Sequence, residues 1–174
     1  MNYEEDKPNS YCGIFGIYGS ETASAQAYYG LHALQHRGQE ASGIVTRSFN
    51  GDNRAHFNIV KGEGLVSEVF ADHNLLIEQL FGNSAIGHNR YSTTGSAKSR
   101  KNIQPFMVNY RMGNLAIGHN GNLTNAKELR EELVNEGAIF QTTSDTEVIL
   151  HLIARSKLDN QIDQIMEALR RIEG

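Results

Sequence analysis

The 174-residue chain has one cysteine, Cys12, and only two prolines beside 17 glycines. A single thiol excludes an intrachain disulfide framework and a cysteine-rich zinc or iron–sulfur site built from these residues alone. The abundance of glycine favours a fold in which backbone segments approach one another closely. The length is that of one ordinary domain, and 39% apolar residues are enough for a real core.

An excess of positive charge is also missing, because 16 basic residues stand against 20 acidic ones for a net charge of −4. With no long basic run, neither nucleic acid nor an acidic membrane surface is the expected main partner. The longest apolar stretches fall far short of the roughly 20 residues that span a bilayer. Residues 1–11 are acidic and lack the apolar region of a secretory signal. These absences predict a cytoplasmic protein.

Hydrophobic periodicity predicts strands alternating with helices and then a run of helices, which is typical of a layered α+β fold. Strands are expected at 12–18, 42–49, 55–62 and 105–112, with turns at 51–53 and at Gly113-Asn114. SAIGHNRYSTTG and NLAIGHNGN are each expected to be a strand that runs into a polar, glycine-rich loop. Helices are expected at 22–37, 64–71, 73–81, 124–136, from Ser144 onward and at 161–172.

Two of these helices carry specific expectations. SDTE at 144–147 reads as a capping box, in which the Ser144 hydroxyl and the Glu147 carboxylate each accept a hydrogen bond from a backbone N–H. In the last helix the expected inner face consists of Ile162, Ile165, Leu169 and Ile172.

The pentapeptide AIGHN occurs twice, at 85–89 and at 116–120. Two copies are too few for a repeat architecture. One interpretation is that two similar strands deliver two adjacent loops, which begin at Arg90 and at Asn120. The alternative is a chance recurrence of small residues.

Cys12 stands where the acidic leader meets the first expected strand. Most free cysteines are small buried hydrophobes, and composition alone favours that interpretation. Cleavage between Tyr11 and Cys12 would instead give the thiol a neighbouring α-amine, which titrates near pH 7.7–8.0. A terminal nucleophile that uses its own amine as the base is a known activation device. No second catalytic residue is then required nearby in the sequence.

Three further motifs fit the same chemistry. HNGN at 119–122 offers an Asn side-chain amide beside a Gly N–H, which suits an oxyanion but also suits a plain Asn-Gly turn. Arg90 can hold a carboxylate through two hydrogen bonds, or it can be a solvated surface residue. Asp145 lies at a helix start, either as an ordinary cap or as the counter-ion of an ammonium group. Together, these groups describe hydrolysis of the side-chain amide of glutamine.

A metal site is the alternative for the histidines. His32 and His36 are spaced i, i+4 on the first helix, but no HExxH arrangement and no third ligand is evident. His88 and His119, which recur in the two AIGHN copies, are expected to fill polar positions behind the loops.

Five segments occur in a defined order between residues 12 and about 155: CGIFGIYG, GLHALQHRGQEASGIV, AIGHNRYSTTG, AIGHNGNL and TTSDTEVILHLIA. Together they resemble the class II glutamine amidotransferase domain of the amidophosphoribosyltransferase family. The resemblance implies an N-terminal nucleophile hydrolase fold, a four-layer αββα sandwich. It also implies that residues 1–11 are a removable propeptide and that 12–174 form the glutaminase domain.

The resemblance implies a role for each site residue. Cys12 is the nucleophile, with Asn120 and Gly121 as the oxyanion hole. Substrate is bound by three residues, namely Arg90 at the α-carboxylate, Asp145 at the α-ammonium and Thr93 in the pocket wall. Support for the nucleophile loop comes from Arg37 and Gly38.

The resemblance further implies partners that this chain does not hold. Ammonia would pass to phosphoribosyl pyrophosphate on a phosphoribosyltransferase domain, for which no acidic substrate loop occurs here. Magnesium and, in propeptide-bearing relatives, an iron–sulfur cluster are expected only with a C-terminal part beyond residue 174. The glutaminase domain itself is expected to continue past Gly174, and the full-length protein is expected to be a homo-oligomer.

Two alternatives stay open at the level of sequence. One is a different class II amidotransferase with another ammonia acceptor. The other is a non-catalytic amino-acid-binding or assembly fragment with the same fold. Release of glutamate from glutamine separates the second alternative from the enzyme.

Overall fold

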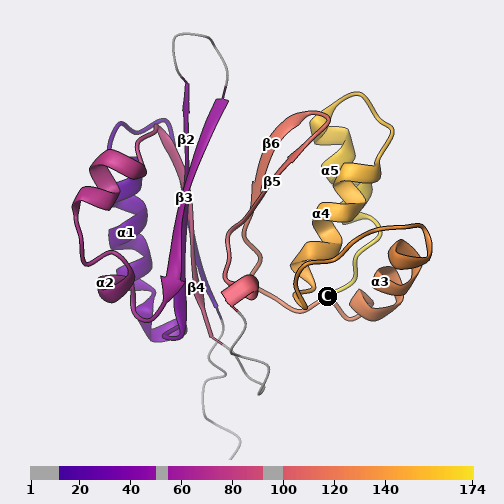
Figure 1. Cartoon of the computed structure of the whole chain (residues 1–174), viewed down its shortest axis with the longest axis horizontal. Coiled ribbons are helices and arrows are strands. Elements are labelled where there is room, and N and C mark those ends of the chain that lie inside the picture. The colour runs from indigo at the N-terminus through magenta and orange to yellow at the C-terminus, as the bar shows by residue number, and fades with distance from the viewer. Residues whose placement is uncertain (1–11, 50–54, 92–99) are drawn as a thin grey trace, which may run out of the picture.

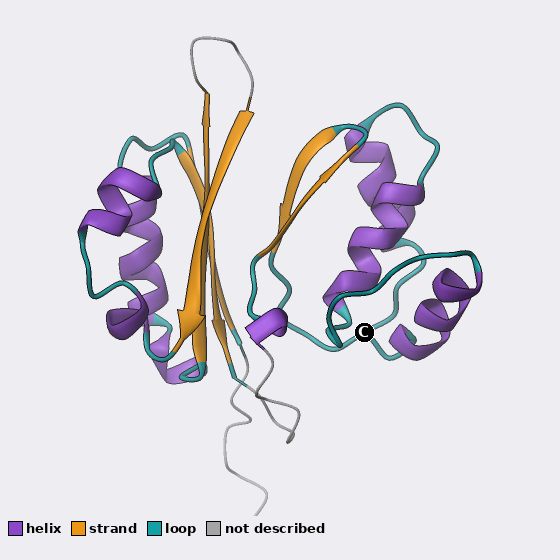
Figure 2. Cartoon of the chain, in the orientation of Figure 1, coloured by secondary structure: helices purple, strands orange, loops and turns teal. Residues whose placement is uncertain are grey.

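Two antiparallel β-sheets face each other between two layers of helices, so the layers follow the order α, β, β, α (Figure 1). The computed structural model describes residues 12–49, 55–91 and 100–174. The longer helices lie on the outer faces of the sheets (Figure 2). This layering confirms the α+β sandwich expected from the sequence.

The first sheet has the strand order β1–β4–β2–β3, with every neighbouring pair antiparallel. Its strands are β1 (Gly13–Tyr18), β2 (Ala41–Phe49), β3 (Ala55–Glu63) and β4 (Ser84–Arg90). β2 and β3 form the predicted hairpin, although its expected turn at 51–53 lies outside the described residues. The register pairs Gly13 with Asn89. Cys12, the residue before β1, is thereby brought to the end of β4.

The outer face of this sheet is covered by α1 (Ala23–Ala33), α2 (Val66–Val69) and the π-helical turn η2 (Leu75–Gln79). Fully buried Leu31, Ile44 and Phe70 form the centre of the core between them. The helix expected over 22–37 is shorter than predicted. It ends at Ala33 and is followed by the 3₁₀ helix η1 (Gln35–Arg37).

The second sheet contains β5 (Phe106–Tyr110) and β6 (Gly113–Ile117), preceded by the 3₁₀ helix η3 (Arg100–Asn102). The turn expected at Gly113-Asn114 is wrong, because Gly113 already pairs with Tyr110 and residues 111–112 form the turn. Gly113 has φ +102, a conformation that a side chain disfavours. The glycine is therefore needed at the first residue of β6 and not within the turn.

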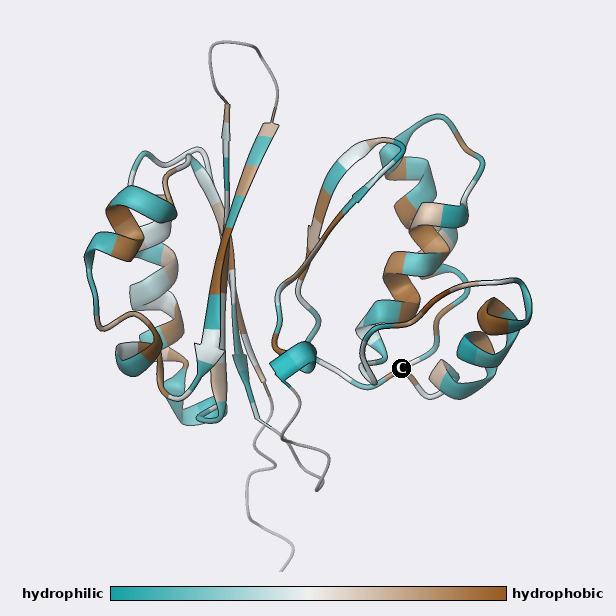
Figure 3. Ribbon diagram, viewed as in Figure 1, coloured by the Kyte–Doolittle hydropathy of each residue, from teal (hydrophilic) through white to brown (hydrophobic). Residues whose placement is uncertain are grey.

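Helices α3 (Ala126–Asn135), α4 (Thr146–Arg155) and α5 (Gln161–Leu169) pack beside this sheet. Apolar residues recur along α4 (Figure 3), where Val148, Ile149 and Leu152 are buried. α3 is followed by Gly137, with φ +89, as expected. Within the described part of the chain, no helix combines the length and apolarity required to cross a bilayer.

The predicted inner face of α5 is only half right. Ile165 and Ile172 pack against the core, but Ile162 is 68% exposed and Leu169 is 47% exposed. The helix instead buries Gln164 and Ala168. The carbonyl oxygen of the Gln164 side chain accepts a hydrogen bond from the Tyr110 hydroxyl at 3.0 Å. A satisfied amide and a small residue thus replace the expected apolar stripe, which no periodicity rule foresees.

The capping box predicted at 144–147 does not form as a reciprocal pair, although each of its two side chains accepts a hydrogen bond from a backbone N–H. The Ser144 hydroxyl accepts from the Thr146 N–H at 3.3 Å. Asp145 is the residue that precedes α4, and its side chain makes no capping hydrogen bond. The Glu147 carboxylate accepts from the backbone N–H groups of Gln141 and Thr142, both at 2.8 Å. The Glu147 carboxylate therefore holds the segment that precedes α4 and does not cap the helix. The Asp145 side chain is available for other contacts.

Candidate active site

Cys12 is half-buried directly before β1, and both its thiol and its carbonyl make contacts with neighbouring segments. Its Sγ lies 3.5 Å from the backbone N–H and 3.6 Å from the carbonyl oxygen of Tyr91, the residue after β4. The Arg37 Nε–H donates to the Cys12 carbonyl at 3.4 Å. The expected supporting residue Arg37 is thus in contact with the expected nucleophile.

Gly38, the other expected supporting residue, lies directly against the end of β4. A Cβ at this position would come within 2.8 Å of the backbone carbons of Asn89 and Arg90. Real Cβ atoms do not approach backbone so closely, so a side chain would displace the strand end. Gly38 has an extended backbone, with φ −156, so steric contact, and not conformation, explains the glycine.

A cavity of about 470 Å³ brings three of the predicted site residues together. Cys12, Arg90 and Asp145 all line it, although they lie far apart in the sequence. The volume falls within the range of small-molecule sites, roughly 300–1,000 Å³. Within one cavity the chain therefore presents a thiol, a guanidinium group and a carboxylate.

The remaining predicted residues are placed differently. Asn120 and Gly121 are exposed in the loop between β6 and α3 and do not line the cavity, whereas Asn122 does. Thr93 lies outside the described residues. The roles of these three predicted residues stay predictions.

Asp145 has the charge state that an ammonium ligand needs. Its Oδ2 accepts from the Leu123 N–H at 2.9 Å, and its Oδ1 lies 3.8 Å from His119 Nδ1. Burial alone raises the pKa of this carboxyl, but the neighbouring His119 imidazole and the hydrogen bond from the Leu123 N–H outweigh burial and hold the pKa below its ordinary value. The carboxylate is therefore ionised at neutral pH.

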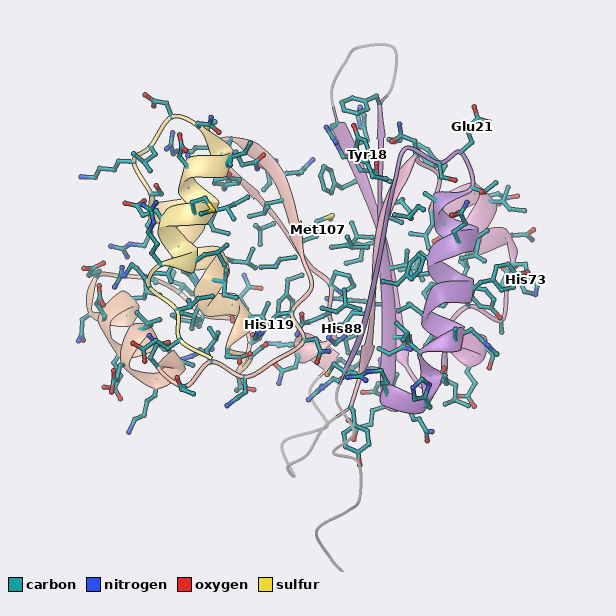
Figure 4. The ribbon with its side chains drawn as sticks, turned by 180° about the vertical axis from the view of Figure 1, so that it is seen from behind. Tyr18, Glu21, His73, His88, Met107 and His119 are labelled. Atoms are coloured by element: carbon teal, nitrogen blue, oxygen red, sulfur yellow. The ribbon has the colours of Figure 1, made fainter. Side chains whose placement is uncertain are left out.

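His88 and His119 meet between the two sheets (Figure 4). They occupy equivalent positions of the two AIGHN copies, yet β4 and β6 belong to different sheets. The His88 Nε2 lies 3.2 Å from the His119 carbonyl oxygen, and the His88 side chain is 1% exposed. Burial, with the charges of Arg90 and His119, lowers the pKa of His88 to about 4. A neutral imidazole therefore stands in the wall behind Arg90.

Sequence reasoning missed several cavity residues, among them Tyr91, Asn102, Gln104 and Arg130. The Arg130 guanidinium donates to the carbonyls of Thr142 and Ser144, at 3.1 and 2.9 Å, and so fixes the segment before α4. For Asn102 and Gln104 the only signal in the sequence is the mixture of polar and apolar residues at 100–106, which is typical of any loop.

The alternative metal site at His32 and His36 gains no support from the geometry. α1 ends at Ala33, and the His36 Nδ1 lies 3.1 Å from the Ala33 carbonyl, so the helical i, i+4 spacing is not realised. Across residues 12–49, 55–91 and 100–174, no group of three or more His, Cys, Asp or Glu residues is placed to hold a metal ion.

The neutral His88 makes folding sensitive to acid. The unfolded chain binds a proton at His88 near pH 6.5 and the folded chain only near pH 4. Stability present above pH 6.5 is therefore lost as the pH falls toward 4, by roughly 3 kcal/mol at about 1.4 kcal/mol per pH unit. We expect His88→Gln to unfold with a weaker pH dependence between pH 6.5 and 4 in urea titrations.

The His88 comparison needs a control because burial also lowers the pKa of His151. His151 is present in both the wild type and His88→Gln. The difference between their two curves of unfolding free energy against pH therefore reports on His88. Parallel curves for the wild type and His88→Gln would show that His88 does not carry the acid sensitivity.

Comparison with known proteins defines the class of this fold and site. Residues 88–174, which include Arg90, the HNGN loop and Asp145, match the family model described as a glutamine amidotransferase domain.

The particular family follows from the individual proteins to which this chain is similar. The chain is 49% identical over 170 residues to amidophosphoribosyltransferase 2, chloroplastic, of Arabidopsis thaliana. The aligned region covers 98% of this chain and 29% of that protein. It is 45% identical to an amidophosphoribosyltransferase of Lacticaseibacillus casei, covering 100% of this chain and 86% of that sequence. The solved glutamine phosphoribosylpyrophosphate amidotransferase of B. subtilis superposes with a TM-score of 0.82 at 45% identity, over 92% of this chain and 33% of that one. The chain belongs to the amidophosphoribosyltransferase family.

The chain spans about a third of the length of the Arabidopsis protein and of the solved B. subtilis chain. The N-terminal nucleophile fold expected from the resemblance is confirmed by the superposition.

Proposed function

We propose that this chain is the glutamine-hydrolysing part of an amidophosphoribosyltransferase. Ammonia released from glutamine would go to phosphoribosyl pyrophosphate on another domain, in the first step of purine synthesis. The observation that carries the proposal is the single cavity shared by Cys12, Arg90 and Asp145. The family membership supports the same assignment.

The proposed chemistry begins with the chain cut before Cys12. Its free α-amine takes the thiol proton, and the sulfur attacks the side-chain carbonyl carbon of glutamine. The negative charge that develops on the carbonyl oxygen is stabilised by Asn120 and Gly121. The protonated amine then returns the proton to the departing nitrogen, which leaves as ammonia. Water hydrolyses the remaining glutamyl thioester and regenerates the thiol.

Substrate selection in this proposal depends on the two charged ends of glutamine. Arg90 binds the α-carboxylate with its planar fork of donors, and the ionised Asp145 binds the α-ammonium. Thr93, which lies outside the described residues, keeps its proposed role in binding glutamine. Because the thiol is fixed at the end of β4, only a side chain of suitable length presents its amide to sulfur.

The remaining partners and conditions belong to the same proposal. Magnesium and an iron–sulfur cluster do not fit the described residues, which include one cysteine and no group of three candidate ligands, so no step is assigned to them. Homo-oligomerisation of the longer protein and a cytoplasmic location are also proposed. The chloroplastic relatives show that the family is not confined to one compartment.

The test of the proposed function is glutamate release. The chain that begins at Cys12 should convert L-glutamine to glutamate and ammonia, and should leave D-glutamine and L-asparagine intact. Coupled detection of both products separates hydrolysis from binding. Binding of glutamine without any glutamate would favour the non-catalytic alternative.

Arg90→Lys tests the carboxylate contact, because lysine keeps the charge but loses the bidentate fork. We expect glutamine binding to weaken by about 1.5–3 kcal/mol, the range for hydrogen bonds to a charged group. Titration calorimetry in a Cys12→Ala background measures this without turnover.

The matched control for Arg90→Lys is Arg100→Lys. The Arg100 side chain is 84% exposed and faces Glu63 at 3.6 Å, away from the lining of the cavity. This control should bind glutamine as the parent does. Equal affinities for Arg90→Lys and Arg100→Lys would remove Arg90 from the binding site.

A further inference from the structure

The loop that carries the predicted oxyanion donors is held at both ends by side chains from other segments. At its start the His119 N–H donates to Gln104 Oε1 at 2.7 Å. Just after its end the Leu123 N–H donates to Asp145 Oδ2 at 2.9 Å. The three residues between these anchors, 120–122, therefore have fixed end points.

Gln104 reaches a third segment with the other end of its amide. Its Nε2 donates to Thr146 Oγ1 at 3.2 Å, and Thr146 is the fully buried first residue of α4. Asp145, the proposed ammonium ligand, immediately precedes Thr146. One side chain thus links the start of the HNGN loop to the end of α4 that carries the Asp145 carboxylate.

Gln104 is itself firmly seated. It is 8% exposed, and its backbone carbonyl packs so closely on Gly43 of β2 that a Cβ there would collide with it. The preceding carbonyl, that of Ile103, accepts a hydrogen bond from Lys61 Nζ of β3 at 2.7 Å. These contacts with β2 and β3 hold the backbone of Ile103 and Gln104 against the first sheet. The same sheet positions Cys12 and Arg90.

The loop folds back over the His119 ring. A Cβ on Gly121 would lie 2.9 Å from His119 Nε2. The opposite ring nitrogen, Nδ1, lies 3.4 Å from Thr146 Oγ1. A shift of the His119 backbone would therefore move its ring relative to α4. Gly121, which lies against the ring, would have to move as well.

We propose that Gln104 is a positioning residue that fixes the 119–122 loop relative to Cys12 and Asp145. The proposal rests on the proposed glutaminase function. Gln104 acts through the His119 amide and not on the reacting atoms. Donors for a developing charge must be in place before the reaction, and a displacement of about 1 Å can cost about 10²-fold in rate.

The first arm of the test measures the anchor without using activity. In Gln104→Ala the His119 amide should exchange hydrogen at least about fivefold faster, the factor expected for one lost hydrogen bond. Leu123 should keep its rate because Asp145 still holds it. Gln104→Glu retains the acceptor atom and should restore slow exchange at His119. Unchanged exchange at His119 in Gln104→Ala would overturn the proposal.

Asn102→Ala is the matched control for this arm. Asn102 is equally buried at 8%, and its amide binds the Thr143 hydroxyl at 2.7 Å and the Thr143 N–H at 3.1 Å. The substitution removes a comparable cross-link to the same region without touching the loop. His119 should exchange at the wild-type rate in this variant, and faster exchange would show that any loosening of the segment suffices.

The second arm measures kinetics in the chain that begins at Cys12. Gln104→Ala should lower kcat about 10²-fold while the Kd for glutamine, measured in a Cys12→Ala background, changes less than about threefold. A loss mainly in Kd would make Gln104 a substrate ligand instead, and an unchanged kcat with faster His119 exchange would show that the anchor does not serve the reaction. Either result overturns the proposal.

Failure of the proposed function is distinguished by the unmutated chain. If that chain releases no glutamate, the glutaminase assignment fails, while the exchange arm still decides whether Gln104 holds the loop. Should Gln104→Ala not fold, Thr146→Val removes the far anchor of the Gln104 amide. Faster His119 exchange with a lower kcat is expected there too, and wild-type values of both would overturn the proposal.

Discussion

Glutaminase activity should be undetectable in the chain that retains residues 1–11 and present in the chain that begins at Cys12. In the uncut chain the Cys12 nitrogen is an amide without a basic lone pair. The thiol then has no adjacent base to accept its proton or to return it to departing ammonia. The Cys12 carbonyl and sulfur are already held by Arg37 and Tyr91. The nitrogen is therefore the atom whose chemistry cleavage changes.

The measurement is covalent labelling followed by mass spectrometry. Both forms are incubated with a glutamine-mimicking electrophile, a diazo-ketone analogue of norleucine. The form beginning at Cys12 should gain one adduct, located at Cys12, and the uncut form none. Cys12→Ser should react far more weakly even when cut, because a hydroxyl is a poorer nucleophile at neutral pH. Equal labelling of the cut and uncut chains would mean that the free amine is not needed.

The positions of the strands along the chain could be predicted from the sequence because each strand is a short apolar run bounded by turn residues. The details that failed depend on contacts between elements. The turn was misplaced because an Asn-Gly-like signal at Gly113-Asn114 could not be told from a glycine needed at a strand start. The inner face of α5 was misjudged because Gln164 is buried on the Tyr110 hydroxyl.

In the candidate site, too, some residues could be predicted from the sequence and others could not. Cys12, Arg90 and Asp145 could be predicted because each carries its own chemistry in a short motif, and the structure brings all three to one cavity. Gln104 could not, because its role depends on a partner 15 residues away in the sequence. His88 was expected only as a polar residue behind a loop, and its partner, the His119 carbonyl, is 31 residues away. An amide or an imidazole has no distinctive signature until its partners are known. The reactive groups are therefore recognisable in the sequence, whereas the groups that hold them become recognisable only in the fold.

The structure makes the oxyanion assignment a choice between two asparagines of one loop. Asn120 matches the predicted role, whereas Asn122 lines the cavity. We expect Asn120→Ala to lower kcat by roughly 10²–10³, the range for loss of one oxyanion donor, with glutamine affinity nearly intact. The reason is that the charge which the donor stabilises develops only in the transition state.

Asn122→Ala is the matched control for this prediction, since it removes the same type of side chain two residues along the same loop. Steady-state kinetics of both variants, with glutamine affinity measured in the Cys12→Ala background, assign the donor. A loss of kcat confined to Asn120→Ala supports the prediction. If Asn122→Ala alone lost kcat, Asn122 would be the donor and the role of Asn120 would fall. Equal losses in affinity and turnover for Asn120→Ala would identify a structural residue, because a donor that acts in the transition state leaves ground-state binding unchanged.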